Sequence, residues 1–355
     1  MLKIINPDYP VLLQEKEGEE QLLCSYFEKY SSIHIICDSN TEKCCLPLFK
    51  AVLADFDYKL HVFPAGEQNK SAETLHNLYK ALLNCKADRN ALLINLGGGV
   101  VGDLGGFLAA TYKRGIDFIQ VPTSLLAMVD ATIGGKLGYN FNGIKNSIGC
   151  FANPLAVWIN PVFLKTLGKA ERISGWAEML KHALIADKSH WKALCAFDIL
   201  KEKIIPVDFI AKSLEIKLEI VKADPFEKGL RKILNLGHTI GHALESIALE
   251  RKTALPHGVA VALGILAESY CAVKMELLSA TDFDELEKYI WPIYGKYLPD
   301  KIDLQNVLQF IENDKKNTSG QFNFTLLRKI GEAKYNQSLN IEYIEELVKW
   351  LNSKA

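Results

Sequence analysis

Three histidines that lie close together in the sequence could bind a metal ion. His238 and His242 are four residues apart in the segment 235–245, and His257 follows in a Leu-Pro-His-Gly sequence. If the first segment is helical, both of its imidazoles project from one face, one turn apart. Imidazole is a common zinc ligand, and a catalytic zinc takes three protein ligands and keeps one position open. The chain has only eight histidines, so this concentration favours a metal site.

Two histidines one helical turn apart can also be packing or surface residues, but the neighbouring glycines favour a functional site. Gly237 and Gly241 each weaken a helix by roughly 1 kcal/mol relative to alanine. Glycine is retained at such positions where a backbone or a ligand must come close. The sequence therefore predicts a functional site in this segment.

A second candidate site is a glycine-rich segment that follows an expected strand at 91–96. Gly97, Gly99 and Gly102 satisfy the pattern Gly-x-Gly-x-x-Gly between a strand and an apolar helix. Glycine lets the backbone approach a pyrophosphate, and the N–H groups at a helix start favour anions. The usual fingerprint opens the first βαβ unit, whereas this one follows the third expected strand. The pattern predicts a nucleotide-binding domain of non-standard topology, with a tight structural turn as the alternative.

Several polar residues stand in apolar or glycine-rich surroundings, whereas solvated loops usually carry denser charge. We expect these residues to belong to a site: Asp130, Lys136, Lys145 and Asn146. Glu178 and Lys181 are one helical turn apart, and either line a site or form a surface ion pair worth little.

The expected helix at 207–223 carries a lysine on its apolar stripe. Lys217 lies between Leu214 and Leu218, and a lysine on a buried face costs free energy unless it is paired. It either extends outward to solvent or lines a polar cavity. Arg231 and Asn235 follow, four residues apart, and share one face if that segment is helical.

Two patterns describe the elements that must position these residues. Short β-rich runs at 33–37, 59–63, 91–96 and 117–121 alternate with helical segments, one of them N-capped by Ser71. Such alternation is typical of a parallel sheet covered by helices. Beyond residue 160 helical periodicity dominates, apart from a turn and short strand at 314–327. The sequence predicts an α/β fold: a Rossmann-like, parallel-sheet nucleotide-binding domain over 1–160, and a mainly α-helical metal- and substrate-binding domain over 161–355.

Composition excludes several classes of partner. The formal net charge is −1, so no bulk field favours nucleic acid or an anionic membrane. We see no secretory signal at the N-terminus, and the apolar run 258–267 is far shorter than the ~20 residues that span a bilayer. The eight cysteines show no Cys-x-x-Cys spacing. We therefore expect a cytoplasmic protein with reduced thiols, no nucleic-acid partner and no membrane partner.

Taken together, these motifs resemble those of one enzyme family, the 3-dehydroquinate synthases, which are sugar phosphate cyclases. The resemblance runs from Asp38 to about Lys316. Its segments are Leu96–Asp103, Tyr112–Gly115, Gln120–Asp130, Ile133–Lys136, Ala177–Lys181, Asn235–Glu245 and Pro256–Gly258. Their number and order make the resemblance specific.

The resemblance implies a lyase that depends on NAD and on zinc, with cobalt(II) as an alternative metal. It would convert 3-deoxy-D-arabino-heptulosonate 7-phosphate to 3-dehydroquinate and phosphate, a step of the shikimate pathway and so of aromatic amino acid biosynthesis. The zinc ligands would be Glu178, His238 and His257. This set corrects the interpretation from spacing, because His242 becomes a proton-handling group beside the metal.

The resemblance also assigns roles to the other candidate residues. Catalytic roles would fall to His242, Glu227 (as a proton acceptor), Lys136, Asp130 and Arg231. NAD would contact Asp38, Asn40, Glu67, Lys70, Gly98, Gly99, Val100, Asp103, Thr123, Ser124, Lys145, Phe163, Leu164, Lys165 and Thr166. The substrate would contact Asp130, Lys136, Asn146, Lys181, Lys217, Arg231, Asn235, His242 and one of Lys315 and Lys316. Arg114 would reach the substrate of a neighbouring subunit, which implies a homodimer.

Three other functions remain as alternatives. A different sugar phosphate cyclase would use the same chemistry, but Lys217 and Arg231 with Asn235 favour a substrate that carries a carboxylate. A metal-dependent alcohol dehydrogenase would release NADH, whereas a cyclase shows no net NADH. A non-catalytic NAD-binding or scaffold protein would tolerate the loss of Glu178 or His257.

Overall fold

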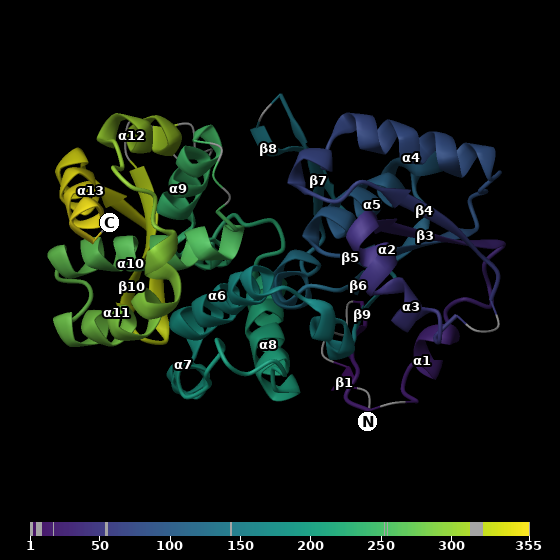
Figure 1. The fold of residues 1–355 in the computed structure, drawn as a ribbon, viewed down its shortest axis with the longest axis horizontal. Coiled ribbons are helices and arrows are strands. Elements are labelled where there is room, and N and C mark those ends of the chain that lie inside the picture. Colours follow the sequence, from purple (N-terminus) through teal and green to yellow (C-terminus); the bar gives the residue numbers. More distant parts are fainter. Residues whose placement is uncertain are drawn as a thin grey trace. The chain divides into compact units, whose positions relative to one another are not determined.

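The structure is a computed structural model, and it describes residues 3–4, 9–16, 18–53, 56–142, 144–251, 253, 255–312 and 322–354. The chain folds into two compact units, Met1–Gly168 and Lys169–Ala355 (Figure 1). The boundary expected from the sequence, after residue 160, lies slightly earlier than this division.

The first unit is built on a seven-stranded sheet in the order β1-β2-β9-β6-β5-β3-β4. Its parallel strands are β2 (Val11–Leu13), β3 (Ser32–Asp38), β4 (Tyr58–Phe63), β5 (Ala91–Gly97), β6 (Asp117–Pro122) and β9 (Ala156–Ile159). β1 (Lys3–Ile4) pairs antiparallel with β2 at one edge. The predicted parallel α/β fold is confirmed, and β2 and β9 were not predicted because each is too short to show a pattern.

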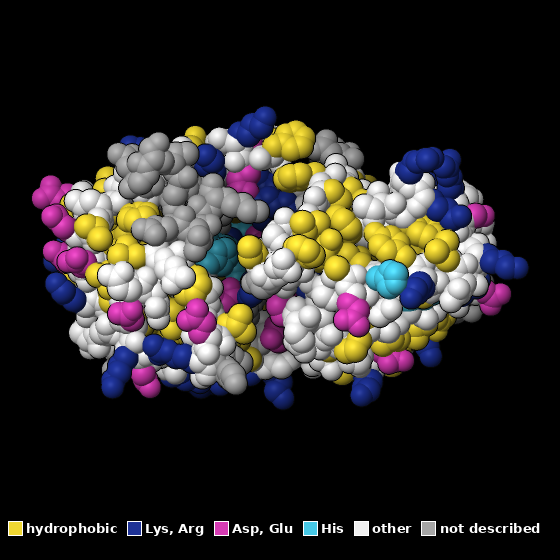
Figure 2. All heavy atoms as spheres, turned by 90° about the horizontal axis from the view of Figure 1, so that it is seen from above, with side chains coloured by type: hydrophobic (Ala, Val, Ile, Leu, Met, Phe, Trp, Pro, Cys, Tyr) yellow, Lys and Arg dark blue, Asp and Glu magenta, His cyan; other side chains and the backbone are white. Residues whose placement is uncertain are grey.

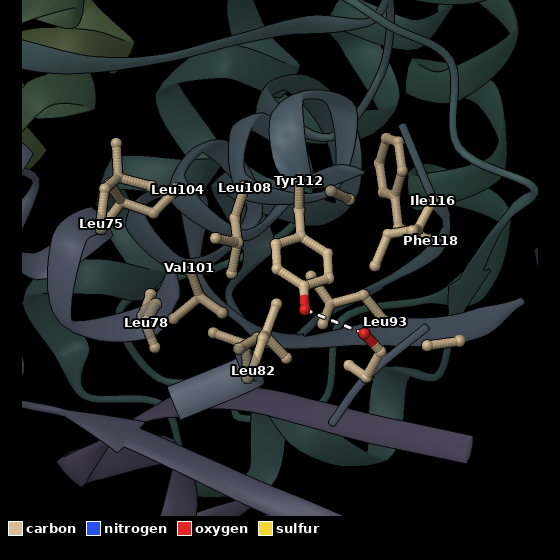
Figure 3. Packing of buried hydrophobic residues seen from close by; sticks show 14 of the residues in the cluster. Leu75, Leu78, Leu82, Leu93, Val101, Leu104, Leu108, Tyr112, Ile116 and Phe118 are labelled. Carbon is tan, nitrogen blue, oxygen red and sulfur yellow. Dashed lines mark hydrogen bonds between the residues drawn. The ribbon is translucent and has the colours of Figure 1, made fainter. Parts of the chain in front are cut away.

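Helices cover this sheet and hold the glycine-rich turn in place. They are α1 (Gln21–Cys24), α2 (Ser39–Cys44), α3 (Leu46–Phe49), α4 (Ala72–Asn84) and α5 (Gly99–Thr111). Ser71 caps α4 as expected, because its Oγ accepts the N–H of Thr74 at 3.3 Å. Leucines of α4 pack against Val101, Leu104 and Leu108 of α5 in one buried cluster (Figure 3). This cluster fixes α5 against the sheet at β5.

Two strands that follow β6 form a hairpin that was not predicted from the sequence. β7 (Lys136–Phe141) pairs antiparallel with β8 (Ile144–Phe151) and forms a sheet of its own. The backbone N–H of Asn140 donates to the carbonyl of Lys70 at 2.8 Å. Glycines in both strands weaken the local sequence signal for β-structure.

A buried pair of histidines joins β3 to β4 and makes the stability of the first unit depend on pH. His34 Nδ1 lies 2.9 Å from His61 Nε2. Burial, with smaller contributions from the charges of His61 and Lys59, lowers the pKa of His34 to about 4. The unfolded chain therefore binds this proton at a higher pH than the folded chain does. The contribution is present above about pH 6.5 and is lost as the pH falls toward 4.

We expect this pair to account for about 3 kcal/mol of the unfolding free energy lost between pH 6.5 and 4, at 1.36 kcal/mol per pKa unit. A His34→Leu, His61→Leu double variant should lose less stability over that range. Urea titrations at several pH values measure the difference. His76→Gln, at an exposed histidine of α4, is the control and should match the wild type. An unchanged acid dependence in the double variant would contradict the assignment.

The second unit is mainly helical, as predicted. Its helices are α6 (Lys169–Ala186), α7 (Lys188–Cys195), α8 (Val207–Ala223), α9 (His238–Glu250), α10 (His257–Lys274), α11 (Ala280–Tyr294), α12 (Leu304–Glu312) and α13 (Ile341–Lys354). α10 is buried along most of its length and contacts α6, α9, α11 and α13, in agreement with its apolar sequence at 259–266. A hairpin of β10 (Phe322–Lys329) and β11 (Glu332–Leu339) completes the unit.

Short 3₁₀ turns connect several of these elements. They are η1 (Glu67–Asn69), η2 (Tyr112–Arg114), η4 (Pro161–Thr166), η5 (Leu230–Asn235) and η6 (Gly295–Tyr297), and η3 (Ala127–Ala131) is a π-helical turn. None of the described helices combines the length and apolar character needed to cross a bilayer. On the face shown in Figure 2, basic and acidic side chains are interspersed.

Candidate metal centre and nucleotide-binding site

Side chains from three helices of the second unit converge in one cluster. Glu178 comes from α6, His238 is the first residue of α9, and His257 is the first residue of α10. The Nε2 atoms of His238 and His257 lie 3.8 Å and 3.7 Å from Glu178 Oε1. Neighbouring ligand atoms of a tetrahedral zinc site with bonds of about 2.1 Å lie about 3.4 Å apart. The cluster therefore has the donor atoms and nearly the spacing that a zinc ion requires.

His242 lies in the same cluster. One nitrogen of each of His238, His242 and His257 falls within 4.8 Å of the others. The structure thus brings together both sets of residues considered from the sequence. Glu178 is fully buried, whereas His242 is exposed, so His242 is the member of the cluster that solvent reaches most easily.

The bonding of Glu178 and the two histidines fits a bound cation. Glu178 Oε1 accepts no hydrogen bond from the described residues, while Oε2 pairs with Lys181. A buried carboxylate oxygen costs free energy unless a partner compensates for lost hydration, and a cation between Glu178 and the histidines would supply that partner. His238 Nδ1 lies 3.2 Å from the carbonyl of Leu236. An N–H donated there leaves the Nε2 lone pair for a metal.

His257 is oriented by a carboxylate that the sequence did not indicate. Its Nδ1 faces Glu245 Oε2 of α9 at 3.4 Å, the arrangement that often holds a zinc-bound histidine. Loss of hydration lowers the pKa of His257, but the hydrogen bond and charge of Glu245 and the charge of Glu178 raise it more. The net result is a pKa above the ordinary histidine value.

Glycines allow the helices to approach closely enough to form this cluster. A Cβ atom on Gly258 would lie 1.9 Å from the carbonyl oxygen of Ser174 on α6. On Gly241 it would lie 2.9 Å from the carbonyl oxygen of Ala260 on α10. The expectation that glycine here permits close backbone approach is confirmed, since any side chain would push α10 away from its neighbours.

Polar residues predicted to contact substrate also lie in the second unit. The buried ones are Lys181, Lys217 and Arg231. Arg231 Nη1 donates to the carbonyl of Pro225 at 2.5 Å, and Asn235 Nδ2 donates to Glu227 Oε1 at 2.6 Å. The expectation that Arg231 and Asn235 share an α-helical face was wrong. Both lie in η5, and a 3₁₀ turn has three residues per turn rather than 3.6.

Asp224, which the sequence analysis did not identify, shapes the loop that carries Glu227 and Arg231. Its carboxylate accepts N–H groups from Lys228, Gly229 and Arg231 at 3.0, 2.6 and 3.1 Å. Loss of hydration raises the pKa of Asp224, but these hydrogen bonds lower it more. Glu227 has a φ of +58°, a strained conformation for a non-glycine residue. Lys315 and Lys316 lie outside the described residues.

The glycine-rich turn lies where the order of the parallel strands reverses. The chain passes from β3 to β4 and then returns to place β5 on the other side of β3. In such sheets, ligands bind at the carboxyl ends of the strands that flank this reversal. Asp38 ends β3, and Gly97 ends β5. A glycine-rich turn directly after β5 is therefore at the expected place for this topology.

The start of α5 suits a phosphate group. The N-cap residue is Gly98, which has no side chain to cap the helix, so the first N–H groups are suited to an anion. The N–H of Thr123 donates to the carbonyl of Gly97 at 3.0 Å. A Cβ on Gly98 would lie 3.5 Å from Ser124 Oγ. The structure thus brings Gly98, Thr123 and Ser124 together.

A network of side chains joins four more of the predicted residues. Lys70 Nζ bonds to Asp103 Oδ2 and Asn146 Oδ1. Asn140 accepts the N–H of Asn146 at 2.8 Å and donates to Glu67 Oε1 at 2.8 Å. Burial raises the pKa of Asp103 although its pairing with Lys70 opposes the change. The β7–β8 hairpin therefore tethers Asn146 to the nucleotide side of the unit.

The remaining predicted residues of the first unit have less uniform surroundings. Asp38 Oδ1 accepts the N–H groups of Asn40 and Thr41 at 2.9 and 2.8 Å, so it caps α2. Asp130 lies in the π-helical turn η3, a conformation often found at functional sites. Phe163 packs on Trp158 and is 1% exposed, so only its backbone can meet a ligand. The other positions are Asn40, Lys136, Lys145, Lys165 and Thr166, which are exposed, Val100, which is partly buried, and Leu164, which is buried.

Sequence comparisons identify the family of the chain. Residues 60–174 match the family 3-dehydroquinate synthase N-terminal, and residues 175–317 match 3-dehydroquinate synthase C-terminal. The chain is 41% identical over 319 residues to the 3-dehydroquinate synthase of Parabacteroides distasonis, and the aligned region covers 90% of each chain.

Two solved structures have the same fold over nearly their whole length. One is ValA, a 2-epi-5-epi-valiolone synthase from Streptomyces hygroscopicus with NAD⁺ and Zn²⁺ bound (25% identity, TM-score 0.87, 100% and 99% coverage). The other is 2-deoxy-scyllo-inosose synthase complexed with carbaglucose-6-phosphate, NAD⁺ and Co²⁺ (23% identity, TM-score 0.85, 99% coverage of each chain).

A parallel sheet with a glycine-rich turn, followed by a helical unit with a histidine–carboxylate cluster, defines a class of enzymes that use a nucleotide and a metal. Within that class, the matches over residues 60–317 are specific. The chain belongs to the 3-dehydroquinate synthase family.

Proposed function

We propose that this protein converts 3-deoxy-D-arabino-heptulosonate 7-phosphate to 3-dehydroquinate and phosphate, with NAD and zinc as cofactors. The observation that carries the proposal is the convergence of Glu178, His238 and His257 in a chain of this family. NAD⁺ and Zn²⁺ in the ValA structure support the choice of cofactors. Cobalt(II) would occupy the same donor set.

The reaction requires little more than positioned charges and proton carriers. When bound, zinc polarises a substrate oxygen and NAD accepts and returns a hydride. The substrate alcohol becomes a ketone, the adjacent C–H becomes acidic, and phosphate leaves by elimination. Reduction of the ketone, ring opening and an intramolecular aldol reaction then close the carbocycle. All electrons return to the substrate, so no NADH accumulates.

The roles proposed for this chain's residues come from the resemblance to the family, and their surroundings support several of them. Exposed His242, beside the zinc ligands, exchanges protons with the substrate. Glu227 accepts a proton in the strained loop that Asp224 organises. Lys217 and Arg231 are 6% and 2% exposed, and bind the substrate carboxylate with Asn235, while Lys181 holds a substrate oxygen near the metal. The resemblance to the family also assigns substrate contacts to Asp130, Lys136 and Asn146.

Substrate choice distinguishes this reaction from that of other cyclases. The test compares phosphate release from the heptulosonate phosphate with release from glucose 6-phosphate and sedoheptulose 7-phosphate, which lack the carboxylate. We expect turnover of the heptulosonate phosphate alone, with stoichiometric 3-dehydroquinate. Turnover of a neutral-headed sugar phosphate instead would assign the chain to another cyclase activity.

A Lys217→Met variant should lower kcat/KM for the heptulosonate phosphate by about 10²–10³-fold, because a buried charged hydrogen bond worth about 3–4 kcal/mol is lost. Steady-state kinetics measures the loss. Lys212→Met on the same helix is the control, since Lys212 is 44% exposed and pairs with Asp187. A kcat/KM of the Lys217 variant equal to that of the wild type would show that this side chain does not contact the substrate.

We further propose a homodimer in which Arg114 acts on the substrate of the neighbouring subunit. Arg114 is exposed, and Lys113, Arg114 and Gly115 have φ values of +52°, +71° and +114°. The strained backbone of this turn costs free energy, and contacts at a subunit interface would offset that cost.

Mixing inactive Arg114→Ala chains with inactive Lys136→Ala chains should then restore about a quarter of the wild-type activity. Half of the dimers are mixed, and each has one intact site of two. Activity after subunit exchange, followed by native mass spectrometry, measures the recovery. No recovery despite observed exchange would place Arg114 in its own subunit's site.

A cytoplasmic location is part of the same proposal. All eight cysteines are free, which agrees with a reducing compartment.

A further inference from the structure

The helix that begins with His238 has no capping side chain of its own. Its N-cap residue is Gly237, with a φ of +78°. A Cβ at this position would lie 2.5 Å from Ile265 Cγ1 and 2.6 Å from the carbonyl oxygen of Val261, both on α10. The close approach of α10 therefore excludes the serine, threonine or aspartate that usually satisfies the first N–H groups of a helix.

The helix that excludes a capping residue also supplies a substitute for it. Glu268 of α10 accepts the N–H of Gly237 at 2.6 Å and the N–H of Ile240 at 3.1 Å. Gly237 and Ile240 occupy the N-cap and N3 positions of α9. A capping box satisfies these same two donors with two side chains of its own helix, whereas here one carboxylate from another helix satisfies both.

The carboxylate of Glu268 is buried, so it needs hydrogen-bond partners within the protein. Glu268 is 0% exposed, and a fully buried glutamate is rare unless it is hydrogen-bonded and electrostatically compensated. The positive end of the α9 dipole provides that compensation. In turn, the carboxylate offsets the positive helix end that would otherwise face a metal cation beside His238.

The two bonded N–H groups flank His238 along the chain. Fixing the backbone at Gly237 and Ile240 fixes the direction in which the His238 side chain leaves α9. The contact between His238 Nδ1 and the carbonyl of Leu236 at 3.2 Å then sets the ring orientation. Together these contacts hold His238 Nε2 at 3.8 Å from Glu178 Oε1.

The bracing is reciprocal between the two helices that carry histidine ligands. Glu268 of α10 fixes the start of α9, and Glu245 of α9 faces His257 at the start of α10 at 3.4 Å. The N–H of Gly258 donates to Ser174 Oγ of α6 at 2.9 Å, which joins α10 to the helix that carries Glu178. Each of the three helices therefore contacts another of them close to the predicted metal ligand that it carries.

We infer that Glu268 is a positioning residue of the metal centre, which holds His238 in its ligating position by capping α9 from α10. The inference rests on the metal centre of the proposed function and is independent of the reaction performed there.

The test measures metal binding rather than turnover. Zinc affinity of Glu268→Gln is determined by competition with a chelating dye, and the visible absorption spectrum of the Co²⁺-loaded variant is recorded. The amide retains one acceptor but directs N–H groups toward a backbone donor. We expect zinc affinity to fall 10–100-fold, the range typical of residues that orient metal ligands, and the cobalt spectrum to change.

A matched control separates positioning from a general loss of helix stability. Ser279 caps α11 by accepting the N–H of Asp282 at 3.0 Å, and α11 carries none of the predicted ligands. Ser279→Ala should lower the Tm while leaving the zinc affinity and the cobalt spectrum as in the wild type.

Glu268→Asp provides a second variant if the glutamine variant does not fold. It keeps the charge but withdraws the carboxylate by one methylene, and it should also weaken zinc binding. Zinc affinity within about twofold of the wild type and an unchanged cobalt spectrum, in either folded variant, would overturn the inference. Wild-type protein that binds no zinc would overturn it together with the proposed function. Wild-type protein that binds zinc but does not turn over the heptulosonate phosphate would contradict only the proposed function.

Discussion

Replacement of both Glu178 and His257 by alanine is expected to lower zinc affinity by about 10⁴-fold and to abolish activity. Structural zinc sites bind with about 10–16 kcal/mol from four ligands, which is roughly 3 kcal/mol or 10²-fold for each ligand. Glu178 Oε1 lies within 3.8 Å of both histidine Nε2 atoms, so the double variant removes two of three donors.

Elemental analysis after gel filtration measures this loss. The control is Glu346→Gln, which removes the charge of a carboxylate that is 51% exposed and pairs with Lys274. It should keep its zinc. Full metal content in the double variant would contradict the assignment of the metal centre to these side chains.

A Lys181→Met variant should separate metal binding from catalysis. Lys181 Nζ pairs with Glu178 Oε2, and both side chains are 1% exposed. Without zinc, removal of the lysine leaves a buried carboxylate uncompensated, which should cost about 3–5 kcal/mol of the unfolding free energy. Zinc supplies the missing positive charge. The variant should therefore bind zinc at least as tightly as the wild type, while its kcat/KM falls about 10²–10³-fold because a substrate contact is lost.

The measurement is the rise in Tm when zinc is added to metal-free protein. This rise should be larger in Lys181→Met than in the wild type, because zinc binding also restores the lost compensation. Lys201→Met is the control, since Lys201 forms an ion pair with Asp198 at the same spacing, 3.1 Å apart, but is 84% exposed. Its removal should change stability by less than about 1 kcal/mol. A smaller zinc-dependent rise in Lys181→Met would show that Lys181 supports the metal site instead of competing with zinc for Glu178.

Local patterns predicted much of this architecture. The runs at 33–37 and 91–96 are apolar because both faces of β3 and β5 are covered, and such strands are recognisable without knowledge of their partners. His238 and His242 could be placed on one helical face from their spacing alone. Glu178 could not be added in this way because α6 reaches the histidines only through tertiary packing. Its predicted role came from the resemblance to a family.

Glu268 and Asp224, which orient parts of the site, were not predicted, for a different reason in each case. Glu268 lies 31 residues from Gly237, and no local pattern connects them. The sequence feature that could have identified Glu268 is a carboxylate directly after the apolar run 258–267. Asp224 lies just after α8, where acidic residues are usually exposed. The 3₁₀ turn at Leu230–Asn235 also has no strong signal, since its sequence is compatible with an α-helix.

Phosphate release per molecule of bound NAD, recorded together with the absorbance of NADH, tests the central claim most directly. Protein loaded with zinc and one equivalent of NAD is supplied with excess 3-deoxy-D-arabino-heptulosonate 7-phosphate. We predict many phosphates released per NAD, an equal amount of 3-dehydroquinate, and no accumulation of NADH. One NADH formed for each substrate consumed, without phosphate release, would contradict a cyclase and indicate a metal-dependent dehydrogenase.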